Sequence, residues 1–171
     1  MKKIFDMKTF ATLLFCIAFN SLSFAQKCTF NIQETDSKTG LQKKHIMNSV
    51  TNQFIVWTNN DEGKYKLGLE ITMPELQKEN ILKGDTLTIL LSNNETVLAF
   101  ANEKYIPVGK ADEMTESTNY FPIYSVSSSD WMKLCATNIQ YIKVTFGKEY
   151  VGFDINESKA KKIKQAAICV K

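Results

Sequence analysis

The chain of 171 residues has a formal net charge of +3, and all 21 of its basic residues are lysines. Arginine is the preferred side chain for bidentate recognition of phosphate and carboxylate groups, so its absence disfavours a phosphate pocket or a DNA reader. Residues 1–25 contribute +2 of the net charge. The remaining +1 gives no reason to expect nucleic acid as a partner.

Residues 1–25 have the pattern of a cleaved signal peptide. A basic start precedes a largely apolar run, and Ser23 and Ala25 stand at the −3 and −1 positions of a cleavage site before Gln26. The apolar run is too short for a stable membrane-spanning helix, and no later stretch is apolar enough to be a transmembrane anchor. We therefore expect an exported protein, periplasmic or secreted, whose residues 26–171 form a single domain.

Alternating apolar and polar residues predict short strands over most of the chain. Gly40 and the polar run 59–63 are typical of the turns between them. Residues 75–82 are expected to form a helical turn or a loop, and the polar residues 103–118 an irregular segment. In the first three quarters of the chain, the predicted strands cover residues 29–33, 41–47, 53–58, 65–73, 86–91, 96–101 and 120–126.

Two helices are predicted, the longer one near the C-terminus. A serine-rich cap signal precedes a short helix over residues 131–137, and Asn138 is the expected left-handed stop. Two further strands around a turn at Gly147 lead to an amphipathic helix capped by Asn156 or Ser158. A short helix is marginal by itself, so its apolar stripe is expected to dock on the hairpin directly before it. The stripe consists of Ala160, Ile163, Ala166, Ala167 and Val170.

These elements predict an α+β fold. Hairpin connections predominate and no alternation of strand and helix is visible, which favours a largely antiparallel sheet of about eight short strands. The C-terminal helix is expected to pack on one face of this sheet. A β-sandwich with a helical appendage is the alternative.

Three cysteines follow the predicted leader, and in an oxidising compartment two of them are expected to pair. Cys28 opens the first strand and Cys169 ends the last helix, and the ends of a domain often lie close together. Cys135 falls on the apolar side of its short helix, where a free cysteine behaves as a small hydrophobe. We predict a disulfide between Cys28 and Cys169, with Cys135 reduced.

No catalytic set, cofactor site or metal site can be assembled from the sequence. His45 is the only histidine, and no serine-nucleophile motif accompanies it. The acidic pairs Glu34 with Asp36 and Asp61 with Glu62 are of the kind that glycosidases use, yet they are equally common in turns. A third acidic group lacks the residue order of a calcium-binding EF-hand loop. It consists of Asp112, Glu113 and Glu116.

Aromatic side chains anchor both protein cores and binding sites, and three are candidate binding residues here: Trp57, Phe121 and Tyr124. The leading hypothesis is a non-enzymatic exported domain that binds another protein or an envelope component. One alternative is a carrier that holds a small apolar ligand with aromatics such as Trp57 and Phe54. Another is an inhibitor that inserts residues 103–118 into a secreted hydrolase. A hydrolase of unknown type is the enzymatic alternative.

Two short motifs carry a resemblance to other proteins. They are Cys28-Thr29-Phe30 with Asp36-x-x-Thr39-Gly40, and Phe153-Asp154-Ile155 with the lysine-rich helix that follows. Together they resemble small exported bacterial α+β domains of uncharacterised function. The resemblance covers a minor part of the chain and implies an exported α+β domain, without an activity, a cofactor or catalytic residues.

Overall fold

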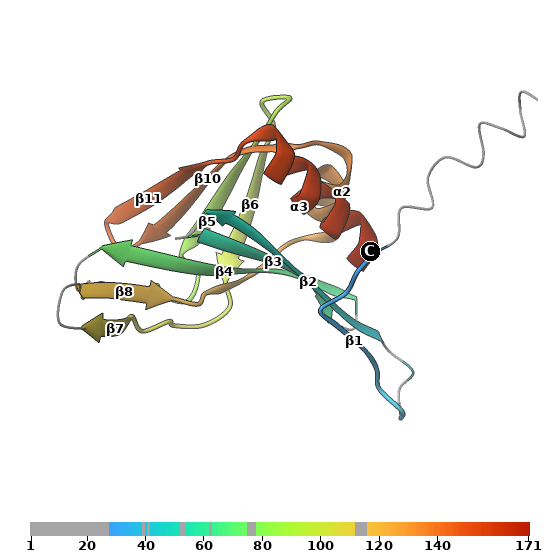
Figure 1. Cartoon of the computed structure of the whole chain (residues 1–171), viewed down its shortest axis with the longest axis horizontal. Helices are drawn as coiled ribbons and strands as arrows, with labels where there is room; N and C mark the ends of the chain where they lie inside the picture. Colours follow the sequence, from blue (N-terminus) through green and yellow to red (C-terminus); the bar gives the residue numbers. More distant parts are fainter. Residues whose placement is uncertain are drawn as a thin grey trace, which may run out of the picture.

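The computed structural model describes residues 28–38, 40, 42–51, 54–61, 63–74, 78–111 and 116–171. Within them, one sheet of eleven strands curves around two helices (Figure 1). The signal peptide predicted over residues 1–25 lies outside the described residues. In the part of the chain that the structure describes, no helix combines the length and apolar character that crossing a bilayer requires.

Most consecutive strands are joined as antiparallel hairpins. The strands are β1 (Ile32–Thr35), β2 (Gln42–Thr51), β3 (Phe54–Asp61), β4 (Lys64–Pro74), β5 (Thr86–Leu91), β6 (Thr96–Ala101), β7 (Val108–Ala111), β8 (Glu116–Tyr120), β9 (Ile123–Ser125), β10 (Ile139–Phe146) and β11 (Glu149–Asp154). The helices are α2 (Ser128–Ala136) and α3 (Glu157–Val170).

The order across the sheet is β1-β2-β3-β4-β9-β6-β5-β10-β11, with β8 beside the second half of β4 and β7 beyond it. The recorded strand pairs are all antiparallel. The predicted α+β class and antiparallel sheet are therefore confirmed. The sandwich alternative is not found, because the described strands form one sheet rather than two.

The number of strands exceeds the eight or nine expected from the sequence for two reasons. The strand expected over residues 120–126 is divided at Pro122, between the end of β8 and the start of β9. Proline has no N–H to donate to a ladder, although its carbonyl still accepts from the N–H of Leu69 at 2.9 Å. The segment 103–118, expected to be irregular, contains β7 and the first residues of β8. Residues 112–115, between these two strands, lie outside the described residues.

The sheet curves far enough to bring strands from its two wings into contact. Phe54 of β3 stacks on Phe153 of β11, with ring centroids 4.1 Å apart, although five strands lie between β3 and β11 in the sheet order. Tyr120 of β8 lies in the same way against Phe146 of β10, at 5.9 Å. These stacked pairs fill the concave interior with aromatic side chains.

Helix α3 lies in this concavity and contacts β2, β3, β10 and α2 (Figure 1). All five residues of the predicted apolar stripe are buried. The prediction that α3 docks on the hairpin before it is only partly right. Of its contact strands, β10 belongs to that hairpin, whereas β2 and β3 come from the other wing of the sheet. Asn156 is the N-cap and its Oδ1 accepts from the N–H of Lys159 at 3.0 Å. At the other end, Nδ2 of Asn60 in β3 donates to the carbonyl of Val170 at 2.8 Å.

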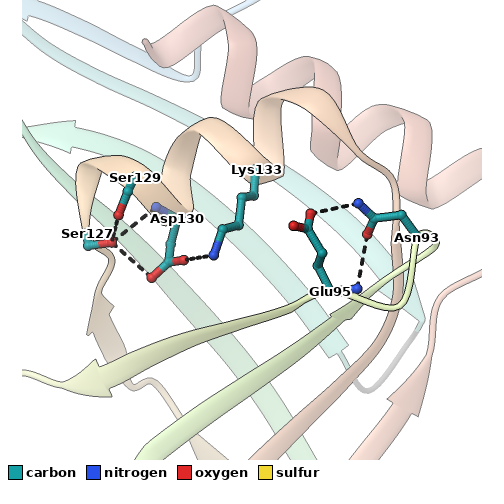
Figure 2. Close-up of polar contacts among 6 residues, drawn as sticks. All are labelled: Asn93, Glu95, Ser127, Ser129, Asp130 and Lys133. Atoms are coloured by element: carbon teal, nitrogen blue, oxygen red, sulfur yellow. Dashed lines mark hydrogen bonds and ion pairs between the residues drawn. The ribbon is translucent and has the colours of Figure 1, made fainter.

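Helix α2 begins at the predicted serine cap, which Figure 2 shows with its polar neighbours. Oγ of Ser127 accepts from the N–H of Asp130 at 3.1 Å, and the Asp130 carboxylate pairs with Lys133 at 2.8 Å. The predicted left-handed stop at Asn138 is wrong. The helix ends through Thr137 in an extended conformation, so the chain passes directly into β10 without the reversal that a left-handed residue produces.

The two helices are held together by Trp131 of α2. Its Nε1 donates to the carbonyl of Ala167 in α3 at 3.2 Å, and its ring stacks on Tyr65 of β4 at 4.8 Å. This fully buried indole therefore connects α2, α3 and the sheet. The hydrogen bond satisfies a polar group that would be costly to bury without a partner.

Cys28 and Cys169 form a disulfide, with their Cα atoms 5.7 Å apart, as the sequence predicts. The start of the described chain thus lies beside the end of α3 (Figure 1). Cys135 is free and half-buried against the core. Burial raises the pKa of the Cys135 thiol, which keeps it protonated and unreactive at neutral pH.

Candidate functional site

The register of the strands sorts the side chains of β2, β3, β4, β9 and β6 onto two faces. Directly opposed residues of an antiparallel pair lie on the same face. On the outer face, away from the helices, one row runs from Met47 through Trp57 and Gly68 to Ile123. The adjacent row consists of His45, Asn59, Lys66, Ser125 and Phe100.

Large apolar side chains gather on this outer face, and we call the group the outer apolar surface. Four of its members are between 41% and 51% exposed, while Trp57 and Ile123 are half-buried. Single exposed hydrophobic residues are ordinary, but a group on one face is typical of an interaction surface. The four exposed members are Met47, Leu98, Phe100 and Phe121.

Gly68 determines how Trp57 lies on this surface. A Cβ atom at position 68 would stand 2.5 Å from Cε3 of the indole, so only glycine lets the ring lie directly against the sheet. His45 meets the same ring in an edge arrangement, with centroids 5.8 Å apart. The indole is therefore fixed on both sides by its neighbours on β4 and β2.

A pocket of about 190 Å³ opens beside this indole, and we call it the Trp57 pocket. Apolar groups come from one row of the outer face and polar groups from the adjacent row. Its lining residues are His45, Trp57, Asn59, Lys66, Gly68 and Ile123.

The electrostatics of the Trp57 pocket combine one cation with neutral polar groups. Burial lowers the pKa of His45 below its usual 6.5, so the imidazole is neutral at pH 7. Lys66 is then the only charged side chain in the lining. Nε1 of Trp57 and Nε2 of His45 are buried and have no hydrogen-bond partner among the described residues. Unsatisfied buried polar atoms are uncommon in folded proteins and call for an explanation.

A larger hollow of about 600 Å³ lies between β2 and α3, beside the disulfide. Its lining combines Met47 and Ala166 with polar side chains such as Asn48 and Gln165. Both cysteines of the disulfide, Cys28 and Cys169, are part of the wall. We assign no function to it.

The structure separates the three aromatic residues proposed for binding. Trp57 and Phe121 lie on the outer face, where a partner can reach them. Tyr124 points into the core with no exposed surface, and burial raises the pKa of its hydroxyl. No surface partner can touch Tyr124. The two aromatics suggested for an apolar carrier, Phe54 and Trp57, lie on opposite faces of β3, so they cannot line one cavity.

The acidic residues singled out in the sequence are not brought together by the described structure. Glu34 lies opposite Lys43 on β1 and β2, and the Asp36 carboxylate accepts from the N–H of Lys38 in a turn. Glu116 is exposed at the start of β8. Glu62, Asp112 and Glu113 lie outside the described residues, as does the side chain of Asp61. Among the described residues no three potential ligands gather as a metal site would require.

Sequence reasoning did not find the polar side of the Trp57 pocket. His45, Asn59 and Lys66 come from three strands, and only their register places them in one row. One signal was available in the sequence. A glycine at position 68, inside a long strand of otherwise bulky residues, indicates the close approach of another group. The sequence does not say that this group is Trp57.

Comparison of the chain with known proteins finds no matching family model, no matching curated protein and no matching solved structure.

Proposed function

We propose that the protein is an exported, non-enzymatic domain that binds another protein or an envelope component through the outer apolar surface. The observation that carries this proposal is that exposed Met47, Leu98, Phe100 and Phe121 share the outer face of the sheet with the fixed indole of Trp57. Aromatic residues and methionine are enriched at the buried centres of interfaces. Covering such side chains with a partner removes apolar area from water, which favours association.

The packing of the inner face favours surface binding over transport of an apolar ligand. The interior between sheet and helices contains stacked aromatic pairs such as Phe54 with Phe153, and Ile163 of α3 is buried against it. The pockets described above lie at the surface instead. A ligand held inside the sheet would have to displace side chains that already pack closely, at a large cost in free energy.

Export is tested by the N-terminus of the mature protein. We expect cleavage after Ala25, so that N-terminal sequencing of the protein recovered from outside the cytoplasm begins at Gln26. The disulfide between Cys28 and Cys169 supports this expectation, because such bonds persist mainly in oxidising compartments. Recovery of the exported protein with Met1 or Met7 at its N-terminus would contradict the predicted leader.

Binding through the outer apolar surface is tested by capture from an envelope extract. The immobilised mature protein and its variants are compared, and captured components are identified by mass spectrometry. We expect Phe100→Ser and Met47→Ser each to weaken capture by about tenfold, because each removes an apolar side chain from the interface. Circular dichroism checks that each variant is folded.

Met132→Ser is the matched control for the capture experiment. Met132 lies on α2 and is 47% exposed, similar to Met47, but it is not part of the outer face of the sheet. Capture by this variant should equal that of the wild type. Equal capture by all of the variants would show that the binding surface lies elsewhere.

A further inference from the structure

We propose that the Trp57 pocket holds one pyranose ring of an envelope glycan. This inference rests on the proposed function, because it names the class of component that the outer face binds. It is carried by the arrangement of an apolar row, with Trp57 at its centre, beside a polar row around one small hollow.

The size of the Trp57 pocket suits a single ring. The hollow of about 190 Å³ accommodates one six-membered sugar but not a disaccharide, so further sugars of a chain would extend over the outer face. The pocket lies between inner strands of the sheet rather than on a mobile loop. Binding sites on regular elements are held more precisely than sites on loops.

The two rows of the pocket match the two chemical aspects of a pyranose. Such a ring has an apolar face of C–H groups and a rim of hydroxyl groups. Trp57 and Ile123 supply the apolar side, and Gly68 between them lets the indole lie directly against the sheet beside the pocket. Asn59, Lys66 and His45 lie in the adjacent row and offer amide, ammonium and imidazole groups to the rim.

The polar row also argues against an apolar side chain of a partner protein as the occupant. A leucine or phenylalanine in the pocket would cover the amide of Asn59 without offering it hydrogen bonds, which is costly for a polar group. Sugar hydroxyls both donate and accept. They are therefore suited to the amide of Asn59 and the other polar groups of the adjacent row.

The indole N–H of Trp57 offers a direct readout of binding. The chain contains two tryptophans, and Trp131 is fully buried in the core, so its indole signal is an internal reference. The mature protein is titrated with soluble oligosaccharides built from hexoses, N-acetylhexosamines and uronic acids, and the two indole signals are followed by NMR. The signal missing from Trp57→Phe assigns Trp57. We expect at least one oligosaccharide to shift the Trp57 signal and to leave that of Trp131 in place.

Two variants locate the bound ring in the pocket. Asn59→Ala removes a polar partner and should weaken binding of the same oligosaccharide by about tenfold, with the fold unchanged. Gly68→Ala places a methyl group where the indole lies and should reduce binding to a similar extent. Met132→Ser, outside the outer face, should bind like the wild type. Binding that is unaffected by both pocket variants would overturn the proposal.

The outcomes separate this inference from the proposed function. If no oligosaccharide moves the Trp57 signal while capture still depends on Phe100 and Met47, the glycan proposal fails and the binding surface stands. If a captured protein is lost in Asn59→Ala and no oligosaccharide binds, a partner side chain fills the pocket and the glycan proposal again fails. If capture is insensitive to Phe100, Met47 and Asn59 alike, the proposed function itself is wrong.

Discussion

Replacement of Ile163 by aspartate is expected to lower the free energy of unfolding by about 3 kcal/mol or more. Ile163 lies on the buried stripe of α3 and is only 2% exposed, between the two wings of the sheet. The substitution removes a large apolar contact and places a carboxylate in the buried interior, where an unpaired charge is costly. Urea denaturation of the mature protein, followed by circular dichroism, measures the change.

Lys162→Asp is the matched control, because it introduces the same side chain at the next position of the same helix. Lys162 is exposed and lies off the buried stripe. We expect a change in the free energy of unfolding of only a few tenths of a kcal/mol. Similar losses for the two variants would mean that α3 docks through a different face.

Loss of the disulfide is expected to have an effect of comparable size. The bond between Cys28 and Cys169 closes a loop with a sequence separation of 141 residues. A link across so long a loop restricts the unfolded chain, and the chain-entropy model gives about 5 kcal/mol as an upper figure. We expect the Cys28→Ser, Cys169→Ser double variant to lose about 2–5 kcal/mol of stability. For the wild type, the contribution of the disulfide to stability is measured from the denaturation midpoints with and without reductant.

Cys135→Ser separates the effect of the disulfide from that of removing a thiol. Cys135 is free and half-buried, so this variant should stay within about 1 kcal/mol of the wild type and keep its sensitivity to reductant. Peptide mapping without reduction gives an independent check of the pairing. A linked peptide containing Cys28 and Cys135, or three alkylatable thiols in the native protein, would exclude the bond seen in the structure.

The two predictions concern the same part of the molecule. Helix α3 spans the concavity of the sheet, the Asn60 amide donates to the carbonyl of Val170, and the disulfide ties Cys169 to Cys28, ahead of β1. Ile163 provides apolar burial in the middle of this helix, whereas the disulfide restrains its end. Because both act on α3, their effects are not expected to be strictly additive.

Local sequence signals alone determined most of the secondary structure. Alternation of apolar and polar residues located the strands because successive side chains of a strand point to opposite faces. Gly40 and Gly147 were assigned to turns, and both have positive φ values, at 70° and 59°. Ser127 and Asn156 cap their helices because their side-chain oxygens lie within reach of a free backbone N–H. Each of these signals acts over only a few residues.

The disulfide was predictable for a different reason. The ends of a folded domain often lie close together, and only Cys28 and Cys169 stand near the two ends of residues 26–171. For Cys135 the sequence offered burial as a free thiol instead of pairing, because it shares a helix face with the buried Trp131. The pairing thus followed from chain geometry and burial without knowledge of the sheet order.

Only the tertiary structure decided which distant residues became neighbours. Helix α3 docks on β2 and β3 because the sheet curves until Phe54 meets Phe153, and this curvature depends on packing over the whole interior. The division of one predicted strand at Pro122 and the pairing of β7 with β8 also depend on the tertiary structure. Which segments pair as strands is decided by the other segments available to them across the whole fold. The polar row beside Trp57 exists because the registers of β2, β3 and β4 align it. Register between strands is set by the burial of one whole face, which no short stretch of sequence specifies.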